Sequence, residues 1–170
     1  NEDWKVLIQK EKSPVLFNQF RVNNKITDVV FQTQGRKPFL NMTKEEKINM
    51  PAVAFAISPV TDLRCEANSF RINAKKDIAP EGSWNLWTNY YIGNQDPTTP
   101  LLSPLMGDYE GLPPLYICVG TDEIHFDDCV NVAQKAKEYG VAVTLRTWPH
   151  MVHAFPILSP LFPEAKQALA

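Results

Sequence analysis

The sequence predicts an α/β fold built on a parallel β-sheet. Residues 53–57 and 115–119 form continuous apolar runs, which are typical of strands buried on both faces of a sheet. A third strand is expected at 141–147, after a helical segment that Gly140 ends. Strands joined by helical crossovers run parallel with right-handed connections. The order strand, long excursion, strand, helix, strand, helix therefore indicates a parallel sheet with crossover helices.

The composition indicates one globular core. The chain has 170 residues, of which 44% are hydrophobic and 21% charged, so disorder is not expected. A net charge of −2 does not support nucleic-acid binding. The longest apolar stretch, 51–57, is far shorter than the roughly 20 residues of a membrane span. Three cysteines without C-x-x-C spacing argue against a disulfide framework and a zinc site.

The chain divides into an atypical segment, 1–49, and a regular part, 50–170. The first has strand-like runs at 4–8 and 26–31 but no functional assignment. The sequence shows no secretory signal, so a cytoplasmic location is expected. Because it begins at Asn1, we expect either processing or a longer parent protein.

A helix is predicted at 83–92, with aromatic side chains along one face. Trp84, Trp87, Tyr90 and Tyr91 recur at helical spacing. Two interpretations remain open, which are ordinary core packing and a lid over an apolar substrate pocket.

Titratable residues follow the second and third strands. Asp122 comes directly after one strand, and His150 and His153 follow the next. Because neighbouring parallel strands end at the same edge of a sheet, a carboxylate and an imidazole can meet there as the acid and base of a catalytic triad. His153 fits the base better, since a small and then an apolar residue follow it, whereas His125 is expected at the surface.

A metal site is the alternative use of these residues, because oxygen and nitrogen ligands could hold a divalent ion. Against it, two of the acids suit a helix N-terminus and no H-E-x-x-H pattern is present, so we predict no metal. The residues weighed are Asp122, His125, Asp127, Asp128, His150 and His153.

Many short motifs occur in an order that resembles the hormone-sensitive-lipase-like branch of the α/β-hydrolases. Residues 58–63 read SPVTDL, and further segments follow at 91–93, 96–97, 100–105, 111–114, 119–123, 127–128, 140–141 and 148–155. The resemblance covers about 50–170 and implies that the three strands are the last three of that family's sheet. It assigns Asp122 as triad acid, His153 as base and 66–105 as part of a cap, and it makes Asp62 structural.

The same resemblance implies hydrolysis of a small-molecule carboxylic ester without a metal or organic cofactor. It also favours the lid interpretation, so Trp84, Trp87 and Tyr90 are candidate substrate-binding residues.

The family's nucleophile motif is missing. The only glycine pair with G-x-S-x-G spacing, Gly107 and Gly111, has Tyr109 at its centre, and no HGGG loop is present. We therefore expect the C-terminal part of a serine esterase or lipase, inactive alone. If turnover were found, Ser58, Ser103 or a serine from a partner chain would be the candidate nucleophile.

Two other functions remain as alternatives. One is a non-catalytic binding module for a small apolar ligand. The other is a fragment of a peptidase, because prolyl-oligopeptidase-like hydrolases share the late Asp and His. In a C-terminal part of the fold the strand at 53–57 would lose its inner neighbour, and the open edge invites pairing with another chain unless 26–31 or 6–8 covers it.

Overall fold

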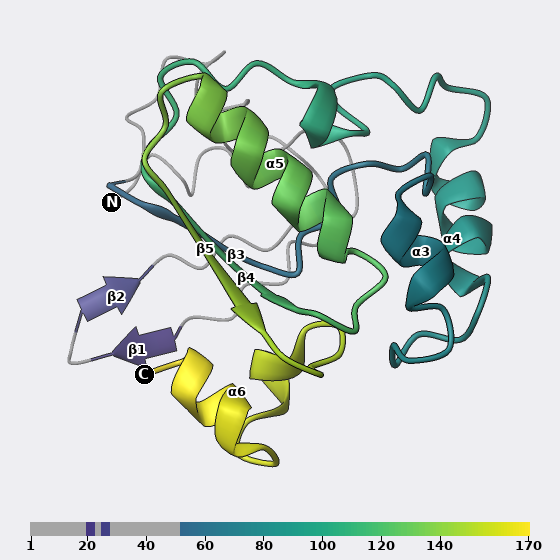
Figure 1. The fold of residues 1–170 in the computed structure, drawn as a ribbon. Helices are drawn as coiled ribbons and strands as arrows, with labels where there is room; N and C mark the ends of the chain where they lie inside the picture. The colour runs from purple at the N-terminus through teal and green to yellow at the C-terminus, as the bar shows by residue number, and fades with distance from the viewer. Residues whose placement is uncertain (1–19, 23–24, 28–51) are drawn as a thin grey trace.

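A computed structural model of the protein describes residues 20–22, 25–27 and 52–170 (Figure 1). Its main sheet is parallel, with β4 (Leu115–Gly120) between β3 (Ala54–Ile57) and β5 (Val143–Trp148). The predicted fold class and the three predicted strands are confirmed. A separate antiparallel pair, β1 (Phe20–Val22) with β2 (Lys25–Thr27), takes in the start of the predicted run at 26–31. The run at 4–8 and the rest of 26–31 lie outside the described residues.

The helices follow the predicted order. The helix predicted at 83–92 is present with those bounds. The crossover helix has His125 as its N-cap residue, so Asp127 and Asp128, which were expected to cap it, lie in its first turn instead. The helical elements are α3 (Asn68–Ile72), α4 (Ser83–Ile92), η1 (Pro104–Met106), α5 (Phe126–Glu138), η2 (Phe155–Leu158) and α6 (Pro163–Ala168).

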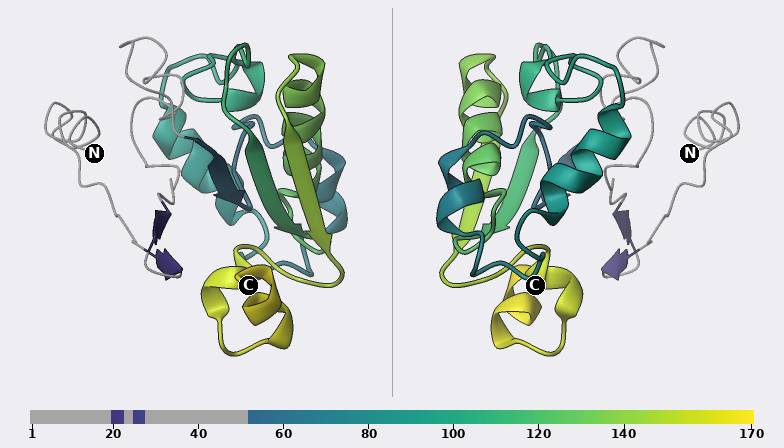
Figure 2. Two further views of the ribbon diagram at one scale, coloured as in Figure 1. Left: turned by 90° about the vertical axis from the view of Figure 1, so that its left-hand side faces the viewer. Right: turned by 90° about the vertical axis from the view of Figure 1, so that its right-hand side faces the viewer.

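Strand β4 is buried on both faces, as its continuous apolar sequence predicts. Side chains alternate along a strand, so Ile117 and Val119 point to one face and Cys118 to the other. The first pair packs with apolar residues of α5, which lies along the sheet (Figures 1 and 2). Cys118 packs against Phe155 and Ala165, which belong to the segment after β5.

The carboxyl ends of the strands carry the loops that matter for function. In the parallel register Ile57 lies opposite Cys118, and Gly120 lies opposite Trp148. The loops after β4 and β5 therefore leave the sheet at the same edge, where η2 and α6 also lie (Figure 2).

Strand β3 is an outer strand of the sheet. On the side away from β4 it has no strand partner among the residues that the structure describes. Pairing through this edge remains a prediction. Within the same residues, no helix combines the length and apolar character needed to cross a bilayer. All three cysteines lie in 52–170 and none forms a disulfide there.

Gly120 allows the two loops to touch. A Cβ at this position would overlap the carbonyl group of Met151, which belongs to the loop after β5. That carbonyl also accepts a hydrogen bond of 3.1 Å from the backbone N–H of Asp122. Only glycine fits between the two backbones.

We predict that Gly120→Ala displaces the loop after β5 and lowers the free energy of unfolding by about 2 kcal/mol or more, because backbone cannot yield as a flexible side chain does. Gly140→Ala is the control, since Gly140 has φ +78° but open space around its Cβ position. It is expected to cost about 1 kcal/mol. Urea unfolding and amide chemical shifts of residues 150–154 measure the two effects. Equal costs with unmoved shifts would contradict the prediction.

Candidate active site

Two acidic residues, Asp122 and Glu123, follow β4, and the chain sends their side chains to different places. The turn closes by a hydrogen bond of 3.3 Å from the N–H of Glu123 to the carbonyl of Gly120. Glu123 is completely buried, whereas the Asp122 side chain is 21% exposed. The turn thus directs the second acid back over the end of the sheet.

The Glu123 carboxylate faces His153. Its Oε1 accepts hydrogen bonds from the Ser58 hydroxyl at 2.8 Å and from the backbone N–H of Gly120. Its Oε2 lies 3.3 Å from Nδ1 of His153. Neither of these two atoms has a hydrogen-bond partner in the described part of the chain, so a small movement of either side chain closes a hydrogen bond between them.

Asp122 instead lies at the surface with His150. One carboxylate oxygen is 3.5 Å from Nδ1 of His150, whose side chain is 86% exposed, and the other is 3.9 Å from Nζ of Lys76. The sequence led us to expect a pair of Asp122 and His153. The described contacts instead place Asp122 with His150 and Lys76. The physical reason is the turn at Gly120, which buries the neighbouring acid instead.

Sequence reasoning missed Glu123 and Ser58 as members of this cluster. Asp122 and Glu123 both follow the strand, and spacing alone does not distinguish them. A usable signal existed for Ser58, because it follows β3 at the same edge of the sheet as His153.

The environment of Glu123 suits an acid that orients a base. Burial raises its pKa, and the facing His153, the Gly120 N–H and the Ser58 hydroxyl oppose that rise. A carboxylate at Nδ1 fixes the ring tautomer with the proton on that nitrogen, so that Nε2 is free to accept a proton.

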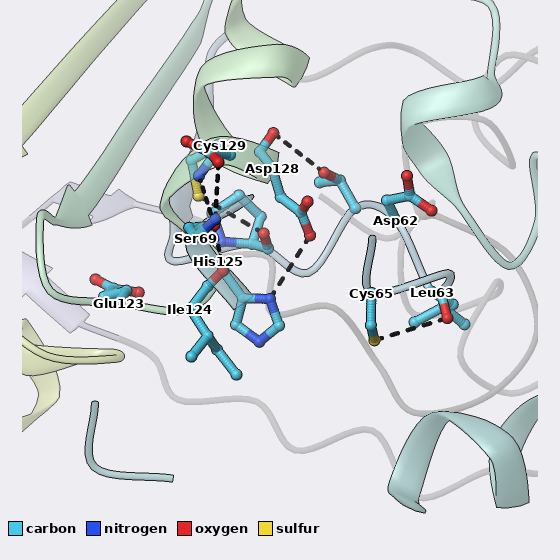
Figure 3. A network of polar contacts seen from close by, with 12 residues as sticks. Asp62, Leu63, Cys65, Ser69, Glu123, Ile124, His125, Asp128 and Cys129 are labelled. Carbon is cyan, nitrogen blue, oxygen red and sulfur yellow. Dashed lines mark hydrogen bonds and ion pairs between the residues drawn. The ribbon is translucent and has the colours of Figure 1, made fainter. Parts of the chain in front are cut away.

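The excursion before α4 holds in place the loop after β4, which carries Glu123 and is called the acid's loop below; the loop after β5, which carries His153, is the base's loop. The Ser69 hydroxyl donates to the carbonyl of Ile124 (Figure 3). The side-chain amide of Asn73, a buried residue, donates to the carbonyls of Thr121 at 3.0 Å and Glu123 at 2.9 Å. Segment 69–73 thus donates hydrogen bonds to three backbone carbonyls of this turn, those of Thr121, Glu123 and Ile124.

Asp77 links the acid's loop to the base's loop. One carboxylate oxygen accepts from the backbone N–H of Ile124 at 2.8 Å, and the other accepts from the backbone N–H of His153, also at 2.8 Å. A single side chain therefore sets the separation of the two backbones that carry the candidate acid and base.

His125 is buried, so the expectation of a surface position was wrong. It is the N-cap residue of α5, and its ring turns inward to meet Phe70 at 5.1 Å and Trp84 at 4.3 Å between ring centroids. Its Nδ1 lies 3.6 Å from a carboxylate oxygen of Asp128 (Figure 3), and its ring is 5.2 Å from that of His153.

Only one of the three predicted substrate-binding aromatic residues reaches His153. The ring of Trp84 packs edge-on against it, with centroids 5.4 Å apart. Trp87 contacts Trp84 but is 53% exposed, and Tyr90 is 81% exposed. The buried face of α4 contains Thr88 and Ile92, which follow Trp84 at steps of four residues. Trp87 and Tyr90 lie off this face and are therefore exposed. A lid role for the exposed rings stays a prediction.

The two serines considered as substitute nucleophiles have other partners. Ser58 donates to Glu123, and fully buried Ser103 donates to the carbonyl of Pro97 and accepts from the N–H of Leu63 at 2.9 Å. Within the described residues, no group of three or more His, Cys, Asp or Glu side chains could hold a metal ion.

Comparison with known proteins gives the family setting. Residues 38–157 match the family described as "alpha/beta hydrolase fold". An acetyl-hydrolase of Streptomyces hygroscopicus is 37% identical over 71% of this chain and 40% of its own length. An esterase of Acinetobacter venetianus is 35% identical over 75% of this chain and 43% of its own length. The chain thus spans about two-fifths of these curated relatives.

Solved structures that resemble this chain are also esterases. A crystal structure of an esterase/lipase from an uncultured bacterium is 38% identical, with a TM-score of 0.72, and is matched over 76% of this chain and 44% of that one. A crystal structure of an esterase from the bacterial hormone-sensitive lipase family is 34% identical, with a TM-score of 0.73 and the same two coverages.

We predict that Asp77→Ala lowers the free energy of unfolding by about 1–3 kcal/mol, because the backbone N–H groups of Ile124 and His153, and that of the exposed Ile78, lose their charged acceptor. Asp96→Ala is the matched control. Asp96 is an exposed aspartate that accepts two hydrogen bonds from the nearby Thr98, so its loss is expected to cost less. Urea unfolding compares the two, and equal losses would contradict a linking role for Asp77.

The His125 and Asp128 pair makes two opposite contributions to pH dependence. Burial lowers the pKa of His125 from 6.5 to about 3, so the folded state loses stability as pH falls through that range. Burial, and then the charges of Asp62 and Asp127, raise the pKa of Asp128 from 3.8 to about 7, so stability falls as pH rises toward 7. Between about pH 4 and 6.5 the two slopes largely cancel.

Single substitutions are therefore expected to expose opposite slopes. In Asp128→Asn, the free energy of unfolding should rise between pH 4 and 6.5 relative to the unsubstituted chain, by up to about 1.4 kcal/mol per pH unit. In His125→Leu it should fall over the same range. Urea unfolding at three pH values measures both slopes, and slopes of the same sign in the two variants would refute this account.

Proposed function

Because the chain belongs to the α/β-hydrolase fold family, in its hormone-sensitive-lipase-like branch, we propose that it supplies the acid and base of a carboxylic ester hydrolase site. Glu123 is the acid in this proposal and His153 the base. The observation that carries it is the buried carboxylate of Glu123, which has one oxygen held by two donors and the other facing Nδ1 of His153.

The chemistry follows from the two nitrogens of His153. With Nδ1–H directed at Glu123, Nε2 accepts the proton of an attacking serine hydroxyl and later returns it to the leaving alcohol. The carboxylate stabilises the imidazolium that exists between these steps. Its burial strengthens this effect, since few competing water dipoles screen the charge.

The serine is proposed to come from outside these 170 residues. The sequence has no G-x-S-x-G motif, and Ser58 and Ser103 both donate to other groups. We therefore propose that the chain alone does not turn over esters. The names of the relatives, an acetyl-hydrolase and an esterase, support a short acyl ester as substrate over a peptide.

A chimera tests the proposal. Residues 50–170 would replace the matched part of the Streptomyces acetyl-hydrolase, which then supplies the front of the fold. We expect hydrolysis of p-nitrophenyl acetate, with kcat lowered about 10³-fold or more by Glu123→Gln and by His153→Ala. The 170-residue chain alone should remain near the uncatalysed rate.

Asp122→Asn is the matched control, because it changes the neighbouring acid that faces His150. It is expected to keep kcat within about threefold of the unsubstituted chimera, since it removes only contacts with the exposed side chains of His150 and Lys76. If Asp122→Asn abolished turnover and Glu123→Gln did not, the assignment of the acid would be refuted.

A further inference from the structure

Ser58 lies where the acid's loop and the base's loop meet. It follows β3, is 2% exposed, and its hydroxyl has two partners. The hydroxyl donates to Oε1 of Glu123 at 2.8 Å and accepts from the backbone N–H of Ala154 at 3.0 Å. Ala154 is the residue after His153, so one oxygen atom connects the candidate acid to the backbone of the candidate base.

The backbone on both sides of this connection is in an unusual conformation. Ser58 has φ +46° and Ala154 has φ +54°, in the left-handed region that residues other than glycine rarely adopt. Such conformations persist only where surrounding contacts hold them, and they cluster at functional sites. Here the hydrogen bond between the two residues is one such contact.

We propose that Ser58 is a positioning residue for the acid and base, which it holds in register through its hydroxyl. The inference rests on the proposed function, since it takes Glu123 and His153 as the reacting pair. Because the Ser58 proton and the Gly120 N–H both bind Oε1, the carboxylate cannot rotate freely, and Oε2 stays directed at His153. The bond to Ala154 holds the ring's own loop against the same oxygen.

Removal of the hydroxyl should loosen the pair without removing either member. In Ser58→Ala and Ser58→Gly, we expect the pKa of Glu123 to rise further, because a hydrogen bond to its charged form is lost. We also expect loss of the downfield Nδ1 proton resonance of His153, since the carboxylate no longer protects that proton from exchange. Both are measured by NMR on the 170-residue chain.

The two Ser58 variants separate the effect of losing the hydroxyl from the effect of backbone strain. Glycine relieves the strain at φ +46° and alanine does not, so a purely conformational role would leave Ser58→Gly unchanged. Ser103→Ala is the matched control, because Ser103 is also fully buried and its hydroxyl also bridges two groups. It should lose stability yet keep the Nδ1 resonance and the Glu123 titration.

Each outcome decides the proposal. Loss of the resonance in both Ser58 variants but not in Ser103→Ala supports it, and a normal resonance and Glu123 titration in Ser58→Gly overturns it. Glu123→Gln distinguishes this result from failure of the proposed function. If that variant leaves the His153 resonance unchanged, the acid–base pair is absent and both proposals fail. If the pair responds to Ser58 but the chimera is inactive, only the proposed function fails.

Discussion

The burial of one carboxylate, that of Glu123, is the constraint on which the rest of the site depends. A charge without contact to water needs polar partners, and Glu123 draws them from each of the three strand ends. Ser58 follows β3, Gly120 ends β4, and His153 lies beyond β5. The parallel register makes this possible, because it brings three segments distant in sequence to one edge of the sheet.

The excursion between β3 and β4 also supports this edge. Asn73 and Asp77 bind the backbone of the acid's loop, and Asp77 binds that of His153 as well. The sequence suggested a cap over a substrate, but these hydrogen bonds run to the loops beneath. The part of the excursion before α4 therefore holds the two loops that carry the proposed acid and base, and a role for α4 as a cap stays a prediction.

Much of the fold could be predicted because periodicity and strand composition report burial directly. The apolar run of β4 and the helix at Ser83–Ile92 were found in this way. The site was harder to predict, because two adjacent acids follow the same strand and only the turn at 120–123 decides which of them is buried. His125 was expected at the surface, because a polar residue at the start of a helix is usually exposed. Its burial depends on packing against Trp84, a contact that local sequence does not report.

The protonation of Asp128 has a calorimetric consequence. Burial raises the pKa of Asp128 to about 7 in the fold, so a substantial fraction of native molecules hold a proton on this carboxyl in neutral solution, whereas the unfolded chain holds almost none. The formal charge of −2 therefore overstates the negative charge of the native molecule. Denaturation near neutrality releases the Asp128 proton while His125 takes up part of a proton, and the heat absorbed includes the buffer's enthalpy of ionisation for the difference.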